Sequence, residues 1–124
     1  MSDKPITVMM LNKRCKIKFL PKVLDADGEV VHGTCDAPGV KNRSICIDKK
    51  LTGEKRVEII LHECLHFCDW WRDEMFVEVV AHDLTRILTR LYGKEAWEAK
   101  ERIAELQEHI DELQERIDEL EQEI

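Results

Sequence analysis

The sequence lacks the features of a membrane protein or of a disulfide-stabilised secreted protein. It has no stretch of about twenty apolar residues, the length that a transmembrane helix needs. Near its start it has only a short apolar run, Ile6 to Leu11, which Asn12 ends, so no secretory signal is predicted. The five cysteines are scattered and odd in number, which favours reduced thiols over a disulfide framework. A cytoplasmic protein is therefore expected.

Positive charge is scarce only in the last part of the chain, where the negative charge is concentrated. The chain has a formal net charge of -7, with four Lys and Arg against twelve Asp and Glu in residues 94–124 and fifteen against fourteen in the rest. A near-neutral first part gives no sign of a nucleic-acid interface, and an acidic second part should not bind anionic membranes. Neither nucleic acid nor a membrane is expected as a partner.

The most informative motif is His62-Glu63-Cys64-Leu65-His66, an HExxH pattern in the apolar stretch from Val57 to Trp71. Two histidines four residues apart share one face of a helix, so both can bind one zinc ion while Glu63 reaches a water on that ion. The apolar flanks predict a buried helix, and buried His and Glu are costly unless a metal or hydrogen bonds satisfy them. The motif therefore favours a metal centre over a solvated strip of polar residues.

A second helix, predicted from Asp73 to Tyr92, should supply the missing ligand. A catalytic zinc normally has three protein ligands and an open position for water. Glu78, twelve residues beyond His66, is the predicted third ligand. Glu74 and His82 are the alternatives. Each lies four residues from Glu78, so a residue that does not bind zinc can orient the one that does.

With these residues the chain resembles a small zincin of the gluzincin type, the compact HExxH plus Glu metallopeptidases of bacteria and phages. The resemblance covers Ile6 to Tyr92, and only its HExxH motif is specific. It implies an α+β domain, residues 1–93, with a short antiparallel sheet followed by the HExxH helix and the Glu helix. It assigns the zinc ligands and the general base as follows: His62, His66 and Glu78 bind Zn²⁺, and Glu63 is the catalytic base. It also implies that Gly33–Pro38 or Ser44–Asp48 forms a wall of the cleft that binds extended peptide.

The expected function is zinc-dependent hydrolysis of peptide bonds in proteins or peptides. Zinc lowers the pKa of its bound water to about 7, and Glu63 accepts the proton and returns it to the leaving amine. The alternative is a non-catalytic coiled-coil interaction protein in which zinc only stabilises the fold. A fourth protein ligand, such as His82 or Cys35, would favour that alternative. Cys64 and Cys68 are expected to be small buried residues instead, because Cys64 lies about 200° around the helix from His62.

Ahead of the motif the sequence predicts a small sheet. Ile6 to Leu11 and Cys15 to Leu20 form a hairpin across Asn12-Lys13-Arg14, and Ser44 to Asp48 is a further strand. Between them, Lys22 to Arg43 contains three glycines and a proline, which indicates a loop region with a short edge strand at Val30 to His32.

Residues 94–124 have the pattern of a coiled coil. Isoleucine and leucine alternate at spacings of three and four residues: Ile103, Leu106, Ile110, Leu113, Ile117, Leu120 and Ile124. Isoleucine at position a and leucine at position d favour a parallel dimer, in which Arg116 pairs with Glu121 of the other chain. A homo-oligomer is therefore expected. The alternatives are a helix folded back onto its own domain and an engineered tail.

Overall fold

The computed structural model describes residues 3–93 and 99–123 and has an α+β architecture, as predicted. The strands are β1 (Ile6–Met10), β2 (Lys13–Leu20), β3 (Val23–Leu24), β4 (Val30–Val31), β5 (Gly33–Cys35) and β6 (Ser44–Asp48). The helices are α1 (Gly53–Cys68), α2 (Glu74–Tyr92) and α3 (Ala99–Gln122). Within the described ranges, no helix is both long enough and apolar enough to cross a membrane.

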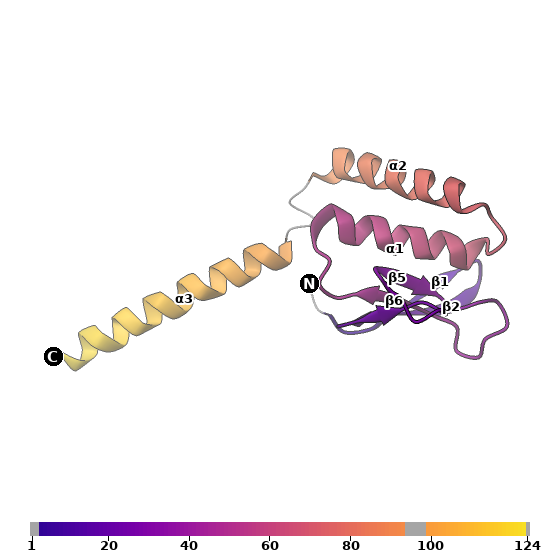
Figure 1. Cartoon of the computed structure of the whole chain (residues 1–124). Coiled ribbons are helices and arrows are strands. Elements are labelled where there is room, and N and C mark those ends of the chain that lie inside the picture. Colours follow the sequence, from indigo (N-terminus) through magenta and orange to yellow (C-terminus); the bar gives the residue numbers. More distant parts are fainter. Residues whose placement is uncertain (1–2, 94–98, 124) are drawn as a thin grey trace.

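The domain that contains the HExxH motif is built in layers. Helix α1 lies on one face of the sheet, and α2 lies antiparallel on the outer side of α1 (Figure 1). Residues 69–73 make the short connection between the two helices, and the Asp73 side chain caps α2 by accepting a hydrogen bond from the Met75 backbone N–H. This short connection places the start of α2 beside the end of α1, which carries the motif.

The main sheet has the strand order β1-β2-β6-β5, and a separate two-stranded ribbon pairs β3 with β4. The predicted hairpin of β1 and β2 is confirmed, but its turn is tighter than expected. Leu11 and Asn12 both have positive φ, which is the conformation of a two-residue hairpin turn. Lys13 and Arg14 therefore belong to β2 and not to the turn.

The prediction of a purely antiparallel sheet is wrong, because β6 pairs in parallel with β2, with Ile17 opposite Ile45. A parallel pair needs a long crossover between its strands. Residues 21–43 provide it, and they contain β3, β4 and β5 rather than a single loop with one edge strand. Strand β5, within this crossover, pairs antiparallel with β6 and forms the edge of the main sheet.

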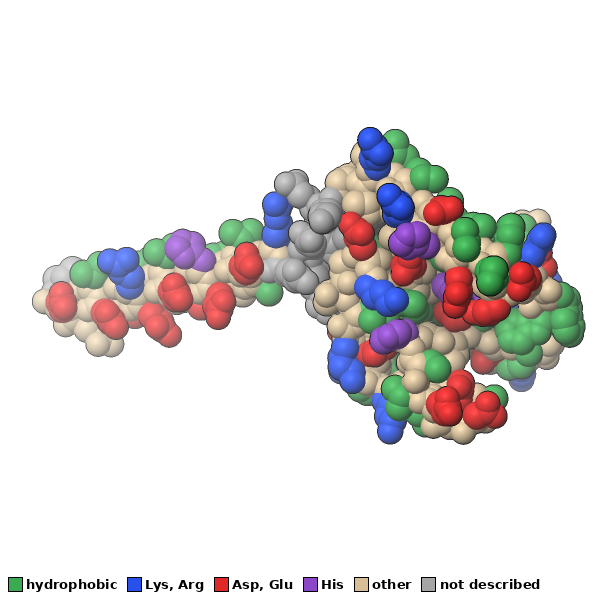
Figure 2. Space-filling view, turned by 45° about the horizontal axis from the view of Figure 1, so that its top comes forward, with side chains coloured by type: hydrophobic (Ala, Val, Ile, Leu, Met, Phe, Trp, Pro, Cys, Tyr) green, Lys and Arg blue, Asp and Glu red, His purple; other side chains and the backbone are tan. Residues whose placement is uncertain are grey.

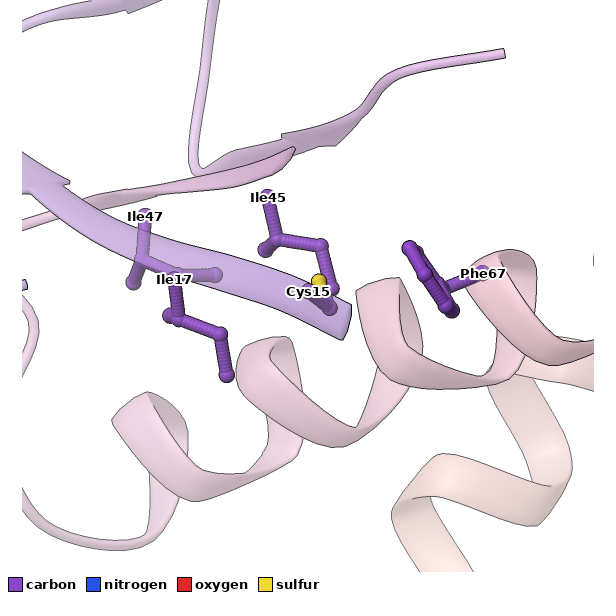
Figure 3. Close-up of a cluster of buried hydrophobic side chains, with 5 residues drawn as sticks. All are labelled: Cys15, Ile17, Ile45, Ile47 and Phe67. Atoms are coloured by element: carbon purple, nitrogen blue, oxygen red, sulfur yellow. The ribbon is translucent and has the colours of Figure 1, made fainter. Parts of the chain in front are cut away.

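The core lies between the sheet and α1 (Figure 3). Alternate residues of β2 and β6 point toward the helix and meet an aromatic ring from its last turns; the five buried residues are Cys15, Ile17, Ile45, Ile47 and Phe67. Burial of this cluster holds α1 against the sheet through the hydrophobic effect. The helix that carries the HExxH motif is thus fixed from one side by apolar packing.

All five cysteines are free thiols, and they differ in exposure. Cys64 is partly buried against the core, as predicted. The same prediction for Cys68 is wrong: this residue is exposed, because it ends α1 where the chain turns away from the sheet.

Helix α3 presents an apolar stripe to solvent. Its six described stripe residues are between 44% and 61% exposed: Ile103, Leu106, Ile110, Leu113, Ile117 and Leu120. Figure 2 shows these hydrophobic side chains along one side of the helix and carboxylates along another. The last predicted stripe residue, Ile124, and residues 94–98, which adjoin the predicted domain boundary, lie outside the described residues.

Candidate metal centre

The two motif histidines lie together on the side of α1 that faces α2. The Nε2 atoms of His62 and His66 are 3.1 Å apart, and both side chains are largely buried. Their convergence follows from the helix, since residues four apart lie one turn above each other on the same face. With the carboxylate of Glu63, their ligand atoms all lie within 4.8 Å of one another.

Glu74 completes this arrangement from the first turn of α2. Its Oε1 lies 2.9 Å from His62 Nε2, and its Oε2 lies 2.9 Å from His66 Nε2. One carboxylate therefore contacts both imidazoles at the nitrogen atoms that would bind a metal. The three side chains form a convergent set of two nitrogen donors and one carboxylate.

The structure brings Glu74 to the histidines in place of Glu78, which had been predicted as third ligand. Glu78 lies along the same cleft but makes no hydrogen bond or ion pair with either histidine within the described part of the chain. The reason is rotational: four residues advance a helix by 400°, so Glu78 lies about 40° further round α2 than Glu74. The buried residues Val77 and Ala81 face α1. Around the axis of α2, the angle between Glu78 and the direction of these two residues is larger than the angle between Glu74 and that direction.

His82, the other alternative, lies still further along α2 and has a different partner. Its Nδ1 is 2.6 Å from Oε1 of Glu58, one helical turn before His62 on α1. The pairs 58 with 82 and 66 with 74 have the register expected for antiparallel helices. His82 therefore lies outside the His62, His66 and Glu74 set.

Glu63 is buried at 6% exposure, on the side of α1 that faces the sheet. Burial, with a smaller effect from the nearby charge of Glu74, raises the pKa of its carboxyl to about 7. The side chain lies beside the convergent set without a hydrogen-bond partner among the described residues. The structure thus places Glu63 beside the predicted metal ligands, and its role as proton acceptor remains a prediction.

Gly33 lets strand β5 approach Glu63 closely. A Cβ atom at this position would lie 2.9 Å from Cγ2 of Ile59 and 3.1 Å from Cγ of Glu63, both too close for an ordinary contact. Any side chain at this position would have to displace the Ile59 and Glu63 side chains, so only glycine fits without a shift. The strand backbone thus forms a wall directly beside the motif.

Arg43 supports the C-terminal end of α1, next to the motif histidines. Its Nη1 donates a hydrogen bond to the Phe67 carbonyl oxygen at 3.0 Å, and its Nε donates to the Asp36 carbonyl oxygen at 2.6 Å. The guanidinium carbon is also 5.7 Å from the centre of the Trp70 ring, which packs edge-on against His66 at 6.4 Å. Arg43 therefore fixes both the last turn of α1 and an aromatic neighbour of a motif histidine.

A cleft of about 920 Å³ opens in front of these residues. It is lined by the β3–β4 ribbon, the start of β5, and the facing sides of α1 and α2: Asp25, Val30, Val31, His32, Gly33, Lys55, Glu58, Ile59, His62, Glu63, His66, Glu74 and Glu78. Figure 2 shows histidine and acidic side chains gathered on this side of the domain. The size is ordinary for a ligand site.

The donor set fits a zinc ion. Zinc binds His nitrogen at about 2.0–2.1 Å, so tetrahedral geometry places two nitrogens about 3.3–3.4 Å apart. The observed separation of 3.1 Å between the two Nε2 atoms is close to that value. Two histidines and a carboxylate are also a ligand set of catalytic zinc sites, whereas structural sites mostly use four ligands rich in sulfur. Cys35 does not join the set, and burial raises the pKa of its thiol to about 12.

Comparison of the chain with protein-family models, with curated proteins and with solved structures gave no match. The interpretation of the site therefore depends on its residues and their geometry, and the resemblance to zincins remains a prediction.

Proposed function

We propose that the domain is a zinc-dependent metallopeptidase, with His62, His66 and Glu74 as the metal ligands. The observation that carries this proposal is the contact of one Glu74 carboxylate with both motif histidines, beside the buried Glu63 in an open cleft. A site that only stabilised the fold would need neither the cleft nor a carboxylate without a partner.

The chemistry divides between the metal and the side chains of the domain. A zinc ion bound by the three ligands supplies a Lewis acid that lowers the pKa of a water to about 7 and polarises a peptide carbonyl. The Glu63 carboxylate takes the proton from the attacking water and delivers it to the nitrogen of the leaving amine. The wall made by Gly33 and Ile59 keeps that carboxylate in place and limits its contact with bulk water.

Strand β5 is the proposed docking site for the peptide. The backbone hydrogen-bonding groups of His32 and Asp36 face β6: the Asp48 N–H donates to the His32 carbonyl, and the Asp36 N–H donates to the Ser44 carbonyl. In an antiparallel pair, successive residues direct their backbone N–H and C=O groups alternately toward the partner strand and away from it. Gly33 and Cys35 therefore direct these groups toward the open edge of the sheet. An extended peptide that adds to this edge would pass in front of Glu63.

Metal analysis combined with a cleavage assay tests the function. The purified chain should contain about one zinc per molecule and cleave casein or members of a peptide library. Removal of the metal with a chelator should abolish cleavage, and added zinc should restore it. Zinc without cleavage of any substrate would favour the non-catalytic alternative, whereas a chain that binds no zinc would contradict both interpretations.

The C-terminal helix supports a second proposal, a parallel homodimer. The apolar stripe of α3 is exposed along its whole described length. Most of the stability of an amphipathic helix comes from packing of its apolar face, and a single copy of α3 lacks that packing. Carboxylates are also unfavourable near the C-terminus of a helix, and the last turn of α3 has no basic residue. Pairing with a second copy would bury the stripe and place Arg116 next to Glu121 of the partner.

Substitution within the stripe tests the dimer. Ile110→Asp combined with Leu113→Asp should reduce the mass in solution from twice the chain mass to the single mass of 14.6 kDa, because two charges would enter the dimer interface. Light scattering after size exclusion measures this change. As a control, Glu108→Ala with Glu115→Ala changes the opposite face and should preserve the dimer. A wild type that is monomeric at high concentration would contradict the proposal.

A further inference from the structure

The second face of the main sheet carries an unusual concentration of positive charge. Both α1 and α2 lie on one side of the sheet (Figure 1), so alternate residues of β2 point to the other side. Cys15 and Ile17 are buried toward α1, whereas Arg14 and Lys16 are exposed and Lys18 is half-buried. Three successive outward positions of one strand are thus cationic.

These side chains line a cavity of about 750 Å³ between the sheet and the loop of residues 38–43. Its lining contains two neutral polar residues, no carboxylate and five cations: Lys13, Arg14, Lys16, Lys18 and Arg43. A concave surface lined by charges of one sign focuses the electrostatic field and attracts ligands of the opposite sign. The cavity should therefore concentrate anions.

Four of the five cations are available to a ligand. In residues 3–93 and 99–123, the charged groups of Lys13, Arg14, Lys16 and Lys18 make no ion pair and no hydrogen bond. Arg43 differs, because its guanidinium is bonded to backbone carbonyls and packs over Phe67. Four cations without partners around one cavity repel each other, and an anion that bound there would relieve this repulsion.

We propose that this cavity binds the phosphodiester backbone of a single-stranded nucleic acid. Outward residues of a strand are about 6.6 Å apart, which is close to the separation of successive phosphates along an extended nucleic-acid strand. Arg14, Lys16 and Lys18 can therefore each face one phosphate. The Thr7 hydroxyl and the Asn42 amide add neutral hydrogen-bond donors of the kind that bind phosphate oxygens.

The same lining predicts binding without recognition of base sequence. Single-strand binding proteins read or hold bases by stacking them on exposed aromatic rings. The aromatic residue of this cavity, Phe67, is only 5% exposed and belongs to the core. The contacts would therefore be to the backbone, and their strength should depend strongly on salt.

This site goes beyond the proposed peptidase and does not depend on it. Cations gather at the sheet cavity, and carboxylates such as Asp25, Glu58 and Glu78 gather at the metal cleft. The near-neutral net charge of residues 1–93 led to the expectation that nucleic acid does not bind, but a sum does not report how charges are distributed.

Binding of a fluorescent oligothymidylate to the full chain, followed by anisotropy over a salt series, tests the proposal. Contacts to three or four phosphates predict that log K falls against log salt with a slope of about -2 to -3. The triple variant Arg14→Gln, Lys16→Gln, Lys18→Gln should bind at least about tenfold more weakly. The single variant Lys16→Gln should reduce the slope by about 0.7. The Glu63→Gln variant should bind as the wild type does.

A matched control changes the same net charge elsewhere. Lys22, Lys49 and Lys50 are exposed and lie outside the cavity lining, so their combined change to glutamine should weaken binding less than threefold, a small electrostatic effect. Equal loss in the control and in the cavity variant would contradict the proposed site, as would the absence of oligonucleotide binding at low salt. Thermal unfolding of each variant shows that it is folded.

Two further probes identify the class of anion. Polyglutamate that competes as well as the oligonucleotide at equal charge would overturn the proposal in favour of an acidic protein segment, such as α3 of this chain. Inorganic triphosphate that binds as tightly as the oligonucleotide would overturn it in favour of a small phosphate ligand. Preference for the oligonucleotide over both probes supports the proposal.

Discussion

Replacement of Glu63 by glutamine should leave zinc bound and reduce peptide hydrolysis by about 10² to 10⁴-fold, the usual contribution of a general base. Glutamine has nearly the same shape, so it fits the space beside Gly33 and Ile59. Its amide cannot accept the proton of the attacking water. His62, His66 and Glu74 are unchanged, so the metal site keeps its ligands.

Zinc content and cleavage rate should be measured on the same preparation of the Glu63→Gln variant. Glu58→Gln is the matched control, because Glu58 lines the same cleft but pairs with His82. It should keep most of the wild-type rate. If the Glu63 variant retains zinc and hydrolyses peptide at the wild-type rate, Glu63 is not the general base.

The helices and the central motif could be predicted from sequence because their signals are local. Apolar spacing on α2 indicated a helix from Asp73 to Tyr92, and the structure has one from Glu74 to Tyr92. The proximity of His62 and His66 follows from helix geometry alone, and their 3.1 Å separation agrees with it. These relations need no knowledge of the rest of the fold.

The strand pairing could not be predicted in the same way. Parallel pairing of β2 with β6 depends on how residues 21–43 cross the sheet, and no spacing in that segment specifies it. The role of Arg43 is hidden for a similar reason, since its partners are backbone carbonyls of Asp36 and Phe67, seven and twenty-four residues away. Every residue has a backbone carbonyl, so the sequence does not show which carbonyl accepts the hydrogen bond.

The choice between Glu74 and Glu78 fell between these cases. Both residues lie on the helix predicted to supply the third ligand, and their spacing from His66 differs by one turn. Which one meets the histidines depends on the rotation of α2 about its axis, which Val77 and Ala81 set by packing toward α1. Both residues are small and buried, a pattern that sequence reasoning could have used to orient the helix.

The zinc affinity of the Glu74→Ala variant should fall by more than about 100-fold relative to the wild type. Loss of a residue that only orients a ligand typically costs 10 to 100-fold, and loss of a direct ligand should cost more. Glu78→Ala removes a carboxylate of the same cleft that makes no ion pair with the histidines, so the zinc affinity of this variant should change less than about tenfold. Competition with a chromogenic zinc chelator measures both constants.

The Glu74→Gln variant separates coordination from packing. An amide can still hydrogen bond to His62 and His66 in the metal-free protein, but it is a much weaker zinc ligand than a carboxylate. This variant should therefore keep the thermal stability of the metal-free wild type and still lose most of its zinc affinity. The opposite pattern, in which Glu78→Ala loses zinc and both Glu74 variants retain it, would return the third-ligand role to Glu78. The contact between Glu74 and the two histidines would then be a hydrogen bond of the metal-free state only.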